Sequence, residues 1–127
     1  MNAPHLKLGI IHATLIAPDL QQVCAAYVAQ LALQVQQRGT LDAEDAAALD
    51  LADLIGAPLA WLANSAGEPV LRVIEDPHAV VAEPMFRHGW LSLEVLVGDI
   101  DTLAAGLHAP FKVLGPAANL ELSDPIR

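Results

Sequence analysis

The sequence predicts an α+β fold built from two related halves. Two segments, residues 6–17 and 89–97, show the period-two alternation of β-strands, and each is followed by a segment with the apolar period of a helix. Residues 12–20 (HATLIAPDL) also align without a gap with residues 92–100 (SLEVLVGDI). In both stretches an apolar strand ends at a turn, and an aspartate precedes the first helical residue. We interpret this alignment as a duplicated strand–helix module.

The first half opens with the strand over residues 6–17, which ends at a Pro-Asp turn. Asp19 is a suitable N-cap, and the apolar residues after it recur at helical spacing as far as residue 33. Cys24 falls on the apolar side of this helix. Since no basic residue is near it in the sequence, we expect a buried structural thiol rather than a nucleophile.

The rest of the first half contains a helix between β-strands. Residues 33–37 alternate and predict a short strand, and residues 38–39 (Arg-Gly) predict a turn. An acidic first turn and an apolar period predict a second helix over residues 42–54. Residues 57–63 and 69–74 are apolar strands, and the Asn-Ser-Ala-Gly sequence between them predicts a hairpin.

The second half begins after a proline-containing segment without a clear period, residues 76–87, which we interpret as a linker. The strand over residues 89–97 follows, then a short helix over residues 100–107 that Asp99 would cap, and then a short strand over residues 111–114. We expect the remaining residues to be mostly loop.

Composition excludes several classes of protein. The 127 residues carry 15 acidic and six basic side chains, a net charge of -9, which disfavours nucleic acids and anionic membranes as partners. No apolar run is long enough for a membrane-spanning helix, and Asp19 interrupts any signal-peptide pattern. A single cysteine excludes an internal disulfide and is typical of a cytoplasmic protein.

The N-terminal residues form a motif with a family resemblance. The motif reads His12-x5-Pro18-Asp19-Leu20-x6-Tyr27-x3-Leu31-x-Leu33. It resembles the opening of vicinal oxygen chelate proteins, the superfamily of glyoxalases, bleomycin-resistance proteins and extradiol dioxygenases. Ala32 stands where the family usually has glycine. Residues 97–101 resemble the start of the family's second module.

The resemblance implies paired βαβββ modules that form a cupped mixed sheet, with helices outside and a small-molecule site inside the cup. It predicts one glyoxalase-like domain over residues 1–127, with a first module at 6–75, a linker at 76–87 and a partial second module at 88–127. On this resemblance we expect the second module to be truncated, because two further strands would have to follow Arg127; the chain would then be a fragment, a shortened variant, or one that a partner completes. We therefore expect a homodimer or higher assembly that covers the open strand edge.

Candidate ligand-binding residues follow from the strand faces. The period-two pattern places one set of polar side chains on a common face of the strands, and the resemblance implies that this face lines the cup. The alternate positions are apolar and are expected to pack against helices. Arg72 either points inward and pairs with a carboxylate of a ligand, or points outward into solvent. The two tryptophans either stack on a planar ligand or belong to the core or an interface. The predicted set is His12, Thr14, Trp61, Arg72, Trp90, Ser92 and Glu94.

The resemblance argues against a metal site of the family type. Its four ligand positions fall on His12, on Leu71, on Ser92 and beyond Arg127, and only His12 is a good ligand. We expect no cofactor. The alternative is a divalent metal held by His12, His88 and Glu94 after a shift of strand register. The other histidines, at positions 5, 78 and 108, are expected at the surface.

Three functions remain. The leading hypothesis is a metal-free, glyoxalase-like protein that binds a small apolar or aromatic molecule. The second is a lyase, isomerase or dioxygenase whose metal site is completed by a partner chain or by missing sequence, with His12 and Glu94 as candidate catalytic residues. The third is a ligand-free interaction or structural domain.

Overall fold

The computed structural model describes residues 10–80, 83, 86 and 92–118 of the chain. It divides into two compact units, Met1–Val81 and Ala82–Arg127. The boundary between them lies within the predicted linker.

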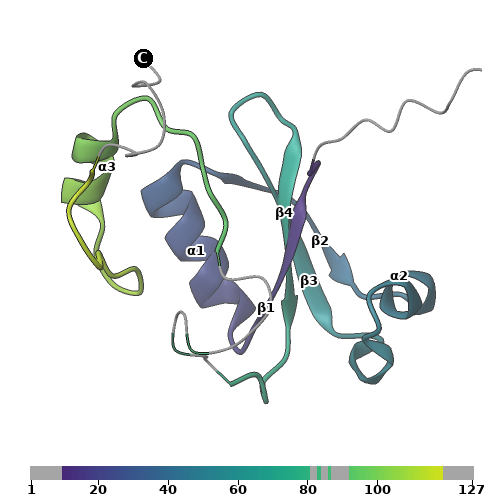
Figure 1. Ribbon diagram of the computed structural model, residues 1–127. Coiled ribbons are helices and arrows are strands. Elements are labelled where there is room, and N and C mark those ends of the chain that lie inside the picture. Colours follow the sequence, from purple (N-terminus) through teal and green to yellow (C-terminus); the bar gives the residue numbers. More distant parts are fainter. Residues whose placement is uncertain (1–9, 81–82, 84–85, 87–91, 119–127) are drawn as a thin grey trace, which may run out of the picture. The chain divides into compact units, whose positions relative to one another are not determined.

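Unit 1 is built on a four-stranded mixed sheet (Figure 1). The spatial order is β1-β4-β3-β2, with β1 parallel to β4 and the other neighbours antiparallel. The sheet and its helices confirm the predicted α+β class. The strands are β1 (Ala13–Ala17), β2 (Gln34–Thr40), β3 (Pro58–Ala63) and β4 (Pro69–Glu75), and the helices are α1 (Leu20–Leu31), α2 (Ala43–Ala48) and the 3-10 turn η1 (Ala52–Leu54).

Helix α1 begins where the sequence predicts. The Asp19 carboxylate accepts a hydrogen bond from the backbone N–H of Gln22 at 2.9 Å, which confirms the N-cap. The backbone N–H of Leu20, the first residue of α1, donates to the carboxylate of Glu75 at the end of β4, also at 2.9 Å. A residue distant in sequence therefore anchors the start of the helix to the sheet.

Two predicted boundaries at this end of the chain are wrong. The strand predicted over residues 6–17 begins only at Ala13; residues 6–9 lie outside the described part. Helix α1 ends at Leu31 because Ala32 adopts a left-handed conformation (φ 54°), and its backbone N–H donates to the carbonyl of Tyr27. This is the position where the family usually has glycine, the residue that adopts such angles without steric cost.

Helix α1 covers one face of the sheet with an apolar core. Of the alternate residues predicted to face a helix, Ala13, Leu15 and Ala17 do so and pack with residues of α1, β3 and β4, whereas Ile11 precedes β1 and is 83% exposed. Cys24 is buried in this core, as predicted, and burial raises the pKa of its thiol more than the charge of Arg38 lowers it. The buried residues of this core are Ala17, Leu20, Cys24, Ala60, Leu62, Leu71 and Val73.

Strand β2 is longer than predicted. The alternation predicted a strand over residues 33–37 followed by a turn at 38–39, but β2 continues through these residues to Thr40 and pairs with β3 along its length. The predicted turn is wrong. Every residue of β2 is exposed, so its sequence carries no burial pattern that would mark its end.

The predicted helix over residues 42–54 is two shorter pieces, α2 and η1. Asp42 caps α2 by accepting a hydrogen bond from the N–H of Asp45 at 2.8 Å. The helix stops because Asp50 adopts a left-handed conformation (φ 56°) and the N–H of Leu51 donates back to the carbonyl of Ala46 at 2.8 Å. This is the bonding of a Schellman motif, formed here without glycine.

These two pieces cover part of the other face of the sheet, opposite to α1 (Figure 1). The apolar side chains of α2 and η1 pack against Leu59 and Trp61 of β3 and against Ile74 of β4. The resemblance implied helices only outside the cup, on the far side from the site. That expectation is wrong, since α2 lies on the face that bears Thr14 and Arg72. The buried residues of this cluster are Leu41, Ala46, Leu59 and Ile74.

Strands β3 and β4 form the predicted hairpin. The side chain of Asn64 accepts hydrogen bonds from the N–H groups of Ala66 and Glu68, each at 3.0 Å, and Gly67 takes a positive φ of 80°. These interactions close the turn.

Unit 2 contains one predicted element among its described residues, α3 (Ile100–Gly106). Hydrogen bonds from the hydroxyl and backbone N–H of Thr102 cap the helix through Asp99 and lower the pKa of that carboxyl. The predicted strand over residues 111–114 is wrong, and so is the described part of the strand over 89–97, since residues 92–97 form no strand and the side chains of Leu93 and Val95 are 48% and 62% exposed. Within the described residues, no helix is both long and apolar enough to cross a membrane.

Ala32→Gly should stabilise the protein. The substitution removes the steric cost of the left-handed conformation, but it also raises the conformational entropy of the unfolded chain, which lowers stability. We expect the first effect to be larger, so that the free energy of unfolding rises by about 0.5–1 kcal/mol. Urea denaturation measures this change. Ala25→Gly, in the exposed middle of α1, is the matched control and should lower the same free energy by about 0.5–1 kcal/mol. Equal signs for the two variants would contradict the assigned end of α1.

Candidate functional site

A row of polar and aromatic side chains crosses the sheet of unit 1 on the face opposite to α1. Pairing registers align Thr14 of β1 with Arg72 of β4, Arg72 with Trp61 of β3, and Trp61 with Gln37 of β2. Paired residues of neighbouring strands project from the same face of a sheet. Three members of the predicted ligand-binding set, Thr14, Trp61 and Arg72, are thus neighbours.

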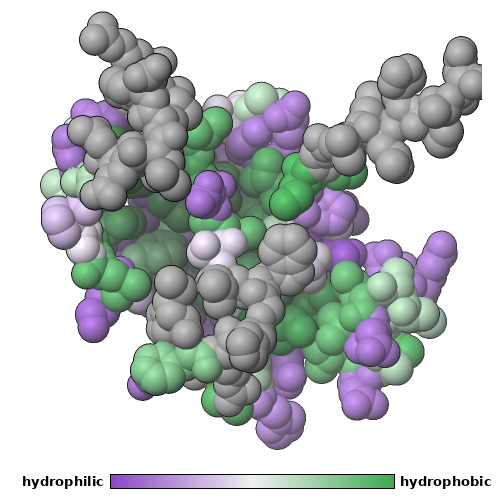
Figure 2. All heavy atoms as spheres, in the orientation of Figure 1, coloured by the Kyte–Doolittle hydropathy of each residue, from purple (hydrophilic) through white to green (hydrophobic). Residues whose placement is uncertain are grey.

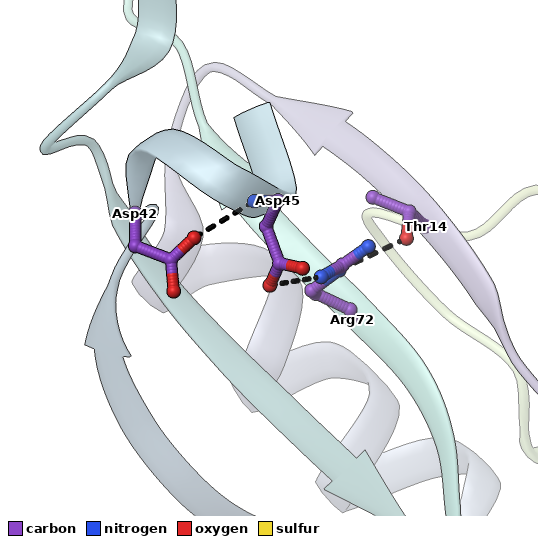
Figure 3. A network of polar contacts seen from close by, with 4 residues as sticks. All are labelled: Thr14, Asp42, Asp45 and Arg72. Atoms are coloured by element: carbon purple, nitrogen blue, oxygen red, sulfur yellow. Dashed lines mark hydrogen bonds and ion pairs between the residues drawn. The ribbon is translucent and has the colours of Figure 1, made fainter. Parts of the chain in front are cut away.

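Arg72 is the centre of this row and is only 6% exposed. Its Nε donates a hydrogen bond to the hydroxyl of Thr14 at 3.1 Å, and its Nη1 donates to the carboxylate of Asp45 on α2 at 2.9 Å (Figure 3). Asp45 supplies the negative charge that a buried guanidinium requires. The outward, solvated arrangement of Arg72 that the sequence left open is therefore wrong.

Trp61 lies between two nitrogen-containing side chains. The guanidinium carbon of Arg72 is 4.9 Å from the centre of the Trp61 ring, a cation–π contact. The ring of His12, just before β1, meets Trp61 edge-on, with 4.9 Å between ring centres and 78° between ring planes. His12 is exposed and Trp61 is partly buried, so this part of the row reaches the surface.

Helix α2 covers only the part of this face next to the row. The apolar cluster under α2 and η1 includes Leu59 and Ile74 and extends to Trp61. Ile16, on the same face as Thr14, keeps 43% of its surface exposed. Figure 2 shows the molecule in the orientation of Figure 1, with exposed hydrophobic side chains interspersed with hydrophilic ones.

The row offers a defined chemistry. A guanidinium with directed N–H groups recognises planar anions, above all carboxylates. An indole ring offers a flat apolar surface for aromatic or aliphatic groups. In this row Trp61 is the partly exposed aromatic ring and Arg72 is the buried cation beside it.

Sequence reasoning missed Asp45 as a residue of this site. The acidic first turn of α2 was interpreted as a favourable interaction with the helix dipole. An indication was available, because an inward arginine on a strand needs a nearby carboxylate and this turn contains three acidic residues. Nothing local, however, indicates which of the three reaches the sheet.

The remaining predicted site residues belong to unit 2. Trp90 and His88 lie outside the described residues. Ser92 and Glu94 are exposed, in a segment that forms no strand, so the strand face predicted to carry them is wrong for residues 92–97.

One of the positions that the resemblance assigns to a metal ligand is occupied by an apolar residue, Leu71. Leu71 is buried in the core under α1, on the other face of the sheet from Arg72. The residues that the structure describes contain no group of three or more His, Cys, Asp or Glu side chains that could hold a metal ion. His78 and His108 are exposed, as predicted.

Comparisons with protein-family models, with curated proteins and with solved structures find no match to this chain. The resemblance to vicinal oxygen chelate proteins therefore stays a prediction that depends on the residues of the motif. What the site can bind therefore depends on the positions and chemistry of its own residues.

Thr14→Val should reveal how strongly the buried guanidinium depends on its partners. The variant keeps the shape of the side chain but removes the acceptor for Arg72 Nε, so we expect the free energy of unfolding to fall by about 1–2 kcal/mol in urea denaturation. Thr40→Val, at an exposed position of β2, is the matched control and should change it by less than about 0.5 kcal/mol. Equal effects of the two variants would show that the Thr14–Arg72 hydrogen bond contributes nothing.

Proposed function

We propose that this protein is glyoxalase-like and binds a small apolar or aromatic molecule on the sheet face of unit 1, without a metal ion of its own. The observation that carries the proposal is the partly buried Trp61 ring, held between His12 and Arg72 on a sheet face where Ile16 is also exposed. An indole fixed by its neighbours loses little conformational entropy when a ligand stacks on it.

The element order of unit 1 supports the family part of this proposal. Strand β1, helix α1 and strands β2, β3 and β4 follow one another as in one βαβββ module, with α2 and η1 inserted between β2 and β3. The predicted motif also falls at corresponding places: Pro18 and Asp19 form the turn before α1, and Ala32 ends the helix. A fold alone does not fix an activity, so the proposal goes no further than binding.

We also propose that the protein is a cytoplasmic homodimer. Strand β1 is at one edge of the sheet and pairs with β4 on its inner side. A free strand edge is a template for pairing with a second chain. The single, buried free thiol of Cys24 is typical of a reducing compartment.

One observation favours a different function, a ligand-free interaction or structural domain. Arg72 already has the partners it needs in Asp45 and Thr14, and α2 fills part of the face with side chains of the protein itself. In that case the row would serve to hold α2 on the sheet, and Trp61 would have no ligand to bind. A metal-dependent reaction has less support, because the described residues bring together no group of three or more His, Cys, Asp or Glu side chains that could hold a metal ion.

Titration with 2-naphthalenemethanol, a neutral aromatic probe, tests the binding function. The chain has two tryptophans, and comparison with Trp90→Phe identifies the indole N–H resonance of Trp61 in two-dimensional NMR spectra. We expect this resonance to shift with a dissociation constant of about 0.1–1 mM, as the size of the probe allows. Trp61→Leu should weaken binding at least about tenfold, because it removes the aromatic contact.

Val28→Ala is the control, since Val28 is an exposed apolar residue on α1, across the sheet from the row. It should leave the dissociation constant unchanged. No shift of the Trp61 resonance at saturating probe, or equal binding by Trp61→Leu and the unmodified protein, would exclude the row as a binding site and favour the ligand-free domain.

A further inference from the structure

The two residues of the ion pair at the centre of the row differ in solvent exposure. The side chain of Arg72 is 7% exposed, whereas that of Asp45 is 51% exposed. The positive charge is therefore fixed in the interior beside Trp61, while the carboxylate that neutralises it reaches it from the surface. An incoming group would meet Asp45 before it met Arg72.

Asp45 belongs to an element with few other attachments to the sheet. Helix α2 has six residues, and Ala46 is the buried one. Such a short helix has little stability by itself and depends on its contacts with the sheet. The carboxylate of Asp45 can therefore leave Arg72 without disruption of a large core.

From this we infer that the ligand class is aromatic carboxylates, and that Asp45 is an internal competitor which occupies the place of the ligand's carboxylate at Arg72. The inference rests on the proposed function, because it requires a ligand at Trp61. A carboxylate ligand stacked beside Trp61 takes over the hydrogen bond from Nη1, and Asp45 turns to solvent. One negative charge replaces another, so the buried guanidinium stays neutralised throughout.

A neutral aromatic molecule cannot make this exchange. It binds beside Trp61 with Asp45 in place and gains nothing from Arg72. The net charge of -9 repels anions in general, so any preference for a carboxylate has to come from a specific local contact. The row provides one such contact at Arg72.

The experiment compares 2-naphthoate with 2-naphthalenemethanol, which has the same ring system without the charge. Asp45→Asn removes the competing carboxylate, and we expect it to tighten 2-naphthoate about tenfold or more, because Arg72 then lacks a charged partner. The same variant should change the dissociation constant of 2-naphthalenemethanol less than twofold. Both constants are measured from the Trp61 indole resonance.

Glu44→Gln is the matched control. It removes the same charge from the neighbouring residue of α2, which is exposed, whereas the ion pair with Arg72 is made by Asp45. It should change the binding of both probes less than twofold. Equal tightening of 2-naphthoate by Asp45→Asn and Glu44→Gln would overturn the inference, because it would reflect the lower net charge alone.

The outcomes separate the two proposals. Binding of the neutral probe without a selective effect of Asp45→Asn on 2-naphthoate retains the binding function and rejects the competitor role. Failure of both probes to bind any of the proteins rejects the binding function itself. If Asp45→Asn does not fold, the Arg72 Nε–H resonance of the unmodified protein decides: it should shift with 2-naphthoate and not with 2-naphthalenemethanol, and its failure to respond to 2-naphthoate would overturn the inference.

Discussion

The pairing register of strand β4 decides which side chains meet in unit 1. This strand lies between β1 and β3, and its residues alternate between the two covered faces of the sheet. Leu71 and Val73 face α1, whereas Arg72 and Ile74 face α2. A slip by one residue would carry the guanidinium into the apolar core under α1, where it would have no counter-ion. The burial of one charge thus fixes the register and, with it, the row that contains Thr14 and Trp61.

The same charge also links two elements that are distant in sequence. Arg72 and Asp45 are 27 residues apart, and their ion pair attaches α2 to the sheet beside the cluster around Leu59 and Ile74. A second long-range contact, from the N–H of Leu20 to Glu75, attaches α1 on the opposite face. Both ends of the segment Arg72–Glu75 therefore carry an anchoring polar group. The site therefore combines the buried Arg72 of β4 and the partly buried Trp61 of β3 with the more exposed Asp45 of α2.

Local signals predicted much of unit 1. The aspartate before α1 and the Asn-Ser-Ala-Gly turn of the hairpin are short-range features, and the alternation within β1 correctly assigned the positions that face α1. Features that depend on distant contacts could not be predicted in this way. Asp50 ends α2 without glycine, β2 has no buried residue to mark its length, and the partner of Arg72 is one of three neighbouring acids. Residues 92–97 have a clear alternation but pair with no strand in the described chain, which explains why the pattern misled.

The most direct test of the account is the position of the Arg72 guanidinium in solution. In a nuclear Overhauser spectrum of isotopically labelled protein, the Nε–H of Arg72 should show contacts with the methyl group of Thr14 and with the indole protons of Trp61. These contacts require the register and the face described above. Contacts of the same proton with methyl groups of Leu20 or Val23 on α1, in place of those with Thr14 and Trp61, would contradict the account.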